Sequence, residues 1–109
     1  MKVNNYVLVR RSVNNIGYFK KVVEFPAMPP IGAEIFFNTL SIYALSLIIN
    51  NITFSELTGE FSLHFDLDIE NEELKYEQPL SDEYFPRKLV KLGFQCEWLE
   101  DKYESILSK

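Results

Sequence analysis

Residues 60–69 read Glu60-Phe61-Ser62-Leu63-His64-Phe65-Asp66-Leu67-Asp68-Ile69, and this stretch decides the fold class. Apolar and polar residues alternate through it without a break. A period of two places successive side chains on opposite faces of a β-strand. The sequence therefore predicts a strand with one face in the core and the other in water.

The first 25 residues predict a β-hairpin. Residues 3–13 and 18–25 are rich in aliphatic and aromatic side chains and alternate in the manner of strands. Asn14-Asn15-Ile16-Gly17 lies between them, and both Asn and Gly tolerate the positive φ of a tight turn. A rigid, proline-rich loop is expected over residues 26–32, because proline cannot donate to a ladder.

Further strands are predicted between this loop and residue 60. Residues 33–37 form a short apolar strand candidate. Residues 42–49 are apolar at nearly every position, which is typical of a strand buried on both faces, although a helix is possible by length. More strand is expected at residues 52–54, followed by a turn at Thr58-Gly59.

The character of the chain changes after Glu70. Residues 71–80 are polar and acidic and predict a loop, with a short strand around residues 74–76 as an option. Residues 81–109 predict a helical part, with a helix that begins between Ser81 and Phe85 and ends near Gly93. Apolar residues beyond this point recur at helical spacing, but Phe94, Cys96 and Trp98 also alternate, so helix and strand both remain open for residues 94–98.

These elements predict an α+β, mostly β fold, in which a strand-rich block precedes helices. The expected architecture is a small twisted antiparallel sheet or an open SH3-like barrel of five to six strands, with one or two C-terminal helices. The length of 109 residues is in the usual range of a single domain, so residues 1–109 are expected to form one.

The net charge of −5 is unevenly distributed along the chain. Residues 1–55 carry a net charge of +3, residues 56–86 of −9 and residues 87–109 of +1. An acidic middle segment disfavours nucleic acid as the partner, because phosphate contacts need a cationic surface. A basic protein partner is favoured instead.

Cysteine usage and hydropathy predict a cytoplasmic protein without a membrane partner. Cys96 is the only cysteine and cannot form an internal disulfide. The longest apolar run, residues 42–49, is far shorter than the roughly 20 residues of a membrane helix. The N-terminus lacks the uninterrupted apolar stretch of a signal peptide.

The polar face of the 60–69 strand is the main candidate site. His64, Asp66, Asp68 and Glu70 share this face if the strand extends that far. Asp66, Asp68 and Glu70 are weak candidates for a divalent-cation site; the spacing up to Glu77 imitates a calcium loop, but Asn71 stands where glycine is required. The simpler interpretation is a solvated face paired with basic residues on neighbouring strands, and the candidates for this are Arg10, Arg11, Lys20 and Lys21.

No residue pattern points to catalysis or to a cofactor. His64 is the only histidine, and no serine or cysteine can be placed beside it from the sequence. Cys96 lies in an apolar setting without adjacent cations and is expected to be an inert thiol. Tyr84-Phe85 adjoins the acidic segment and is a candidate partner-facing patch.

The sequence specifies no activity. The leading hypothesis is a non-enzymatic protein-binding or adaptor domain that uses its acidic strand face or a sheet edge, including homodimer formation through that edge. The candidate partner-binding residues are His64, Asp66, Asp68, Glu70, Tyr84 and Phe85. The alternatives are a divalent-cation-binding domain with its site in residues 64–77 and a small-molecule-binding β-barrel lined by aromatic residues.

Overall fold

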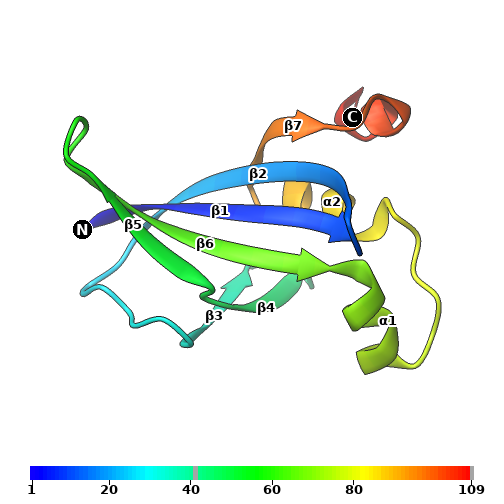
Figure 1. Ribbon diagram of the computed structural model, residues 1–109, viewed down its shortest axis with the longest axis horizontal. Helices are drawn as coiled ribbons and strands as arrows, with labels where there is room; N and C mark the ends of the chain where they lie inside the picture. Colours follow the sequence, from blue (N-terminus) through cyan, green and yellow to red (C-terminus); the bar gives the residue numbers. More distant parts are fainter. Residues whose placement is uncertain (41, 109) are drawn as a thin grey trace.

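Two sheets, two α-helices and one 3₁₀-helix make up the described residues, 1–40 and 42–108, of the computed structural model (Figure 1). Lys109, the end of the expected helical part, lies outside this range. The strands are β1 (Lys2–Arg11), β2 (Asn14–Glu24), β3 (Glu34–Asn38), β4 (Ala44–Ile48), β5 (Asn51–Ser55), β6 (Glu60–Asp68) and β7 (Gln95–Leu99). The helices are α1 (Ile69–Tyr76), α2 (Tyr84–Lys91) and the 3₁₀-helix η1 (Asp101–Ser108).

The larger sheet has the strand order β5-β6-β1-β2-β7, and the smaller sheet pairs β3 with β4. The predicted α+β, mostly β class is confirmed. The five-stranded sheet is mixed, because β1 and β6 run parallel whereas its other pairs are antiparallel. Among the described strands, β5 and β7 each pair on one side only, so the sheet is open.

The β1–β2 hairpin is present, but its predicted turn at residues 14–17 is wrong. The turn lies at Ser12-Val13, and Asn14 is already the first residue of β2. Ser12 adopts the left-handed conformation with φ 54°, and its backbone N–H donates to Asp68 Oδ1 at 3.0 Å. This tertiary contact fixes the turn two residues before the Asn and Gly that predicted it.

The β3–β4 sheet covers the inner face of the larger sheet. β3, β4 and α2 lie behind the five-stranded sheet in the view of Figure 1. Leu45, Leu47 and Ile49 are buried, but Ile48 and Phe36 are each 61% exposed. The prediction of a strand buried on both faces is therefore wrong, because only one face of this two-stranded sheet meets the core.

The core lies between these two layers. Each long strand of the larger sheet turns every second side chain inward, as alternation requires. α2 contributes Phe85 and Leu89, which lie one turn apart on its buried face. The main inward residues of the three central strands are Val3, Val7, Val9, Phe19, Leu63, Phe65 and Leu67.

The segment after β6 is a helix up to Tyr76, so the predicted acidic loop over residues 71–80 is correct only for residues 77–80, and the optional strand around residues 74–76 is wrong. Asp68 caps α1 by accepting a hydrogen bond from Glu70 N–H at 3.1 Å, and Glu70 and Glu72 lie in the first turn, where the helix dipole favours acids. Ile69 is the buried residue of this helix. Capping and electrostatics, more than an apolar stripe, thus account for α1.

The C-terminal part is only partly helical. α2 begins at Tyr84 and ends at Lys91. Gly93, just after the C-cap residue Leu92, has the left-handed conformation (φ 94°) predicted for the end of the helix. Residues 95–99 are a strand paired with β2, which decides between the two expectations for this stretch. None of the helices in the described residues has the length and apolar character required to cross a bilayer.

The side chain of Arg11, at the end of β1, contacts α1 and the segment between α1 and α2. Its guanidinium contacts Glu73 at 3.0 Å and Asp82 at 2.6 Å and donates to the carbonyl of Leu80. Tyr103 on η1 donates to the other oxygen of Asp82 at 2.7 Å, which raises the pKa of Tyr103 to about 12. Burial alone would raise the pKa of Asp82, but the bonds from Tyr103 and Arg11 outweigh it and lower the pKa.

We predict that Gly17→Ala destabilises the fold by about 1–3 kcal/mol, the usual cost of overpacking a core. A Cβ at Gly17 would lie 2.8 Å from Phe19 Cε1 and 3.1 Å from Leu99 Cδ1. Phe19 is fully buried, so its ring cannot move aside without disturbing the core. Urea unfolding measures the effect, with Val13→Ala in the exposed turn as the control. Equal midpoints for the two variants would contradict this packing.

Candidate functional site

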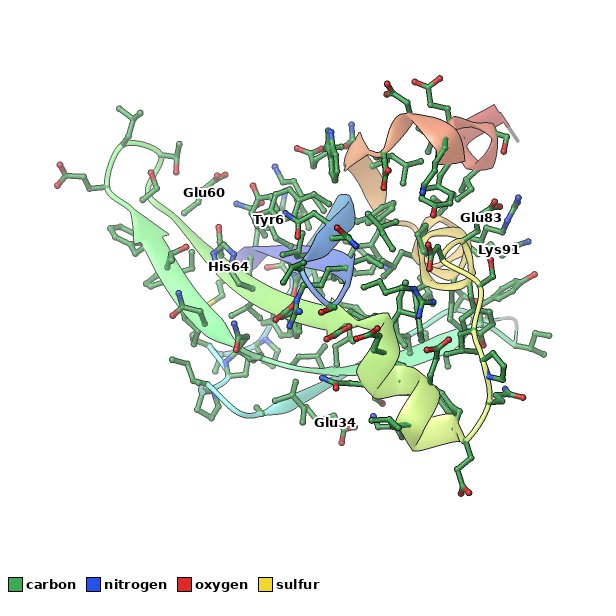
Figure 2. All side chains as sticks on the ribbon, turned by 45° about the vertical axis from the view of Figure 1, so that its right-hand side comes forward. Tyr6, Glu34, Glu60, His64, Glu83 and Lys91 are labelled. Carbon is green, nitrogen blue, oxygen red and sulfur yellow. The ribbon has the colours of Figure 1, made fainter. Side chains whose placement is uncertain are left out.

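The outer face of the five-stranded sheet carries a row of three stacked rings, here called the aromatic ladder: Tyr18 on β2, Tyr6 on β1 and His64 on β6. The ring centroids of Tyr6 and Tyr18 are 5.3 Å apart with planes at 10°. Those of Tyr6 and His64 are 5.7 Å apart with planes at 13°. Figure 2 shows Tyr6 and His64 projecting on the same side of the sheet, away from Glu34 on β3.

Register and alternation together create this ladder. Tyr6 lies directly opposite His64 in the parallel β1–β6 pair. Tyr18 lies opposite Leu8, which is two residues along β1 from Tyr6. The side chains of these four residues point outward, because their chain neighbours point into the core. The spacing of about 4.8 Å between strands lets upright rings on neighbouring strands stack against each other.

Other side chains extend the row across all five strands. Thr53 Oγ1 on β5 lies 2.8 Å from His64 Nε2, and Trp98 on β7 lies opposite Tyr18 and is 47% exposed. Lys20 Nζ lies 5.7 Å from the centroid of the Tyr6 ring. We call the surface formed by the aromatic ladder, Thr53, Trp98 and Lys20 the ladder face.

The carboxylates beside the ladder are paired within the fold. Arg10 contacts Asp66 with two nitrogens, at 2.7 and 2.9 Å, and Asp68 at 3.3 Å. The expectation of pairing to a neighbouring strand is thus confirmed for Arg10. Asp68 has a further structural role, since its Oδ1 accepts from Ser12 N–H and caps α1. The outer face of β6 is therefore much less acidic than its sequence indicates.

The proposed cation ligands do not share one face. Glu70 lies in α1 and is exposed, because β6 ends at Asp68. Asp66 and Asp68 already face the guanidinium of Arg10. In the described part of the chain, no group of three His, Cys, Asp or Glu side chains has a geometry that could hold a metal ion.

The Tyr84-Phe85 pair is divided between the surface and the core. Tyr84 is 42% exposed, whereas Phe85 is fully buried. Their rings meet edge to face at 4.9 Å. The prediction of Phe85 as a partner-facing residue is therefore wrong: it lies one helical turn from Leu89 and packs with it into the core.

The ladder offers ring edges and polar tips more than ring faces. Tyr6 has a ring on each side, so both of its faces are covered within the protein. Its hydroxyl and that of Tyr18 are left as hydrogen-bonding groups at the outer ends of amphipathic side chains. A nucleobase needs an open aromatic face on which to stack. The stacked geometry therefore fits a partner that meets a flat surface of ring edges and hydroxyls.

Burial shifts the pKa values of two groups on and near this face, His64 and Cys96. Burial lowers the pKa of His64, so its imidazole is neutral at pH 7 and its Nε2 contacts Thr53. Burial also raises the pKa of the half-buried Cys96 thiol, which is therefore protonated at neutral pH. The Thr53 hydroxyl and the His64 imidazole are thus within hydrogen-bond distance, but no carboxylate of the described residues contacts the imidazole to orient it.

Sequence reasoning missed most of the ladder face, namely Tyr6, Tyr18, Lys20, Thr53 and Trp98. The outward direction of Tyr6 followed from alternation alone. The missing information was strand order, because nothing local indicates that β1 lies beside β6 or that β7 lies beside β2.

No family model, curated protein or solved structure matches this chain.

We predict that stability decreases between about pH 7 and pH 5.5 because of His64. Its folded pKa is lowered, so as the pH falls the unfolded chain takes up a proton near its ordinary value of about 6.5 while the folded chain resists it. The carboxyls of Glu24 and Glu73 have lowered pKa values and titrate below this range. Thermal unfolding at both pH values measures the loss.

His64→Gln is the matched variant, because its amide keeps a hydrogen-bonding group near Thr53 but does not titrate. Its melting temperature should fall less between the two pH values than that of the unmodified protein. An equal fall in both proteins would show that the native environment does not disfavour the imidazolium.

Proposed function

We propose that this chain is a non-enzymatic protein-binding domain whose partner docks on the ladder face. The observation that carries the proposal is the stack of Tyr18, Tyr6 and His64, extended by the half-exposed Trp98, on the sheet face opposite β3, β4 and α2 (Figure 1). Soluble domains bury most of their large aromatic side chains. A row of them on one outer face favours a docking surface, and its partner would have a flat contact surface as well.

The composition of the ladder face matches the core and rim of a protein interface. Tyr and Trp are enriched at interface centres and among hot-spot residues, while charged residues are depleted there. Here the aromatic residues occupy the middle of the sheet. Charged residues border them, with Lys20 beside Tyr6 and the Arg10–Asp66 pair at one end of the strands.

A protein partner is favoured over nucleic acid on two grounds. Tyr6, in the middle of the ladder, has both ring faces covered, so it does not provide a stacking platform for a base. The cations near it are few, and Arg10 is already neutralised by Asp66 and Asp68, so this face lacks the positive potential that phosphates need.

The free edge of β5 extends the proposed surface. Residues Asn51–Ser55 include no proline and no charged residue, which are the usual protections of an edge strand. A partner strand added beside β5 would lengthen the sheet and continue the ladder face past Thr53. Edge pairing and the ladder face are thus two parts of one proposed contact.

Photo-crosslinking tests the location of the contact. Trp98→p-benzoylphenylalanine places a reactive ketone on the ladder face, and Phe36→p-benzoylphenylalanine places it on the outer face of β3, where the replaced ring is 61% exposed. In extract from the source cells we expect one defined adduct from position 98 and none of that mass from position 36. The same adduct from both positions would refute the assignment.

A second variant tests the ladder residues themselves. Adding Tyr6→Ser and Tyr18→Ser to the crosslinking protein should reduce the adduct about tenfold or more, since hot-spot truncations cost at least a factor of ten in affinity. The melting temperature of this variant must show that it is folded at the temperature of the experiment. An undiminished adduct from the folded variant would contradict a role for the ladder.

A further inference from the structure

A tyrosine-lined hollow with a cationic rim lies on a different surface, beside α2. Its volume is about 360 Å³, and its lining is mostly apolar. Tyr43, immediately before β4, and Tyr84, the first residue of α2, provide its aromatic walls. Its lining residues are Ile42, Tyr43, Tyr84, Arg87, Lys88 and Lys91.

The cations of this hollow stand out in a chain of net charge −5. Arg87 is paired with Glu83 at 2.7 Å. Lys88 and Lys91 lie 5.2 and 4.9 Å from the ring centroids of Tyr84 and Tyr43, and neither has a carboxylate partner in residues 1–40 and 42–108. Two unneutralised ammonium groups therefore flank an aromatic surface, and Figure 2 places Lys91 beside the helix that carries it, away from the ladder face.

The outward face of α1 has the opposite pattern. Glu70 and Leu74 lie four residues apart on one side of α1. Glu77, the C-cap residue of the helix in a left-handed conformation, lines the same shallow hollow as both of them. Leu74 is 78% exposed. Glu72 and Glu73 pair with Lys75 and Arg11, but Glu70 and Glu77 have no ion pair within the described residues. An exposed apolar side chain is thus flanked by two unpaired carboxylates.

We propose that α1 of one copy docks into the hollow of a second copy. Leu74 enters between Tyr43 and Tyr84, and Glu70 and Glu77 face the ammonium groups of Lys88 and Lys91. The argument rests on charge and pattern complementarity: an apolar centre between two acids meets an aromatic centre between two cations. The partner is therefore a second copy of this chain.

This interface is heterologous, because two different surfaces of the chain meet. Each copy offers one α1 and one hollow, so association continues from copy to copy unless a ring closes. The affinity is expected to be low, with a dissociation constant on the order of 10⁻⁴ to 10⁻³ M, since one apolar anchor and two exposed ion pairs barely offset the entropy lost on association. This interface includes no residue of the ladder face, so its test is independent of the test of the proposed function.

Charge reversal with rescue tests the proposal by sedimentation velocity at protein concentrations up to about 1 mM and low salt. The unmodified protein should gain average mass with concentration and lose the gain in high salt, which screens exposed charges. Lys88→Glu with Lys91→Glu, and separately Glu70→Lys with Glu77→Lys, should each stay monomeric. The chain that combines all four changes should associate again, because both charges are exchanged.

A matched control reverses a charge elsewhere: Lys2→Glu, at the exposed start of β1, should leave self-association unchanged. A monomeric unmodified protein at the highest concentration would overturn the proposal and leave the hollow to an acidic segment of another protein. A combined variant that is folded but monomeric would overturn it equally.

Amide NMR spectra of the unmodified protein provide a test that needs no variant. On dilution, shifts should change at residues 70–77, 42–43 and 84–91 and stay constant along β1 and β6. Concentration-dependent shifts confined to other residues would contradict the docking of α1 in the hollow.

Discussion

The parallel pairing of β1 with β6 is the constraint on which the rest of the structure depends. A parallel pair cannot be joined by a tight turn, so the chain must cross over before β6 can run beside β1. The β3–β4 hairpin lies in this crossover and covers the inner face of the sheet. The same register aligns Tyr6 with His64 and Arg10 with Asp68, so the aromatic ladder and the neutralised carboxylates both follow from one pairing.

Local sequence pattern predicted the strands and their faces but not their neighbours. Alternation in residues 60–68 identified both the strand and its buried side, because a period of two has one structural solution. The pairing of Arg10 with the carboxylates of β6 was among the expected contacts. The ladder was not, because it depends on strand order, and strand order is decided by how the whole chain packs.

Particular residues explain why the sequence did not predict α1 and did not decide between helix and strand after Gly93. α1 buries Ile69 and otherwise depends on the Asp68 cap and the Arg11–Glu73 contact, so it has little of the apolar periodicity that marks a helix in a sequence. The Asp68 cap followed by acids was the available signal. Beyond Gly93, a strand followed by a 3₁₀-helix buries Leu99, Tyr103 and Ile106, and this spacing imitates one continuous helix.

The acidic middle segment of the sequence is not one acidic surface in the fold. The carboxylates of this segment that lie on β6 face Arg10. At the C-terminal end of β1, Arg11 forms ion pairs with Glu73 and Asp82. Two arginines adjacent in sequence thus point to opposite faces of one strand and neutralise two different parts of the segment. The acids left unpaired by both arginines include Glu70 on α1 and Glu77 at its C-cap, and the cations without an ion pair in the described residues include Lys88 and Lys91 on α2. The unpaired charges of Glu70, Glu77, Lys88 and Lys91 therefore lie on or next to the two helices, and the face of β6 keeps its carboxylates paired with Arg10.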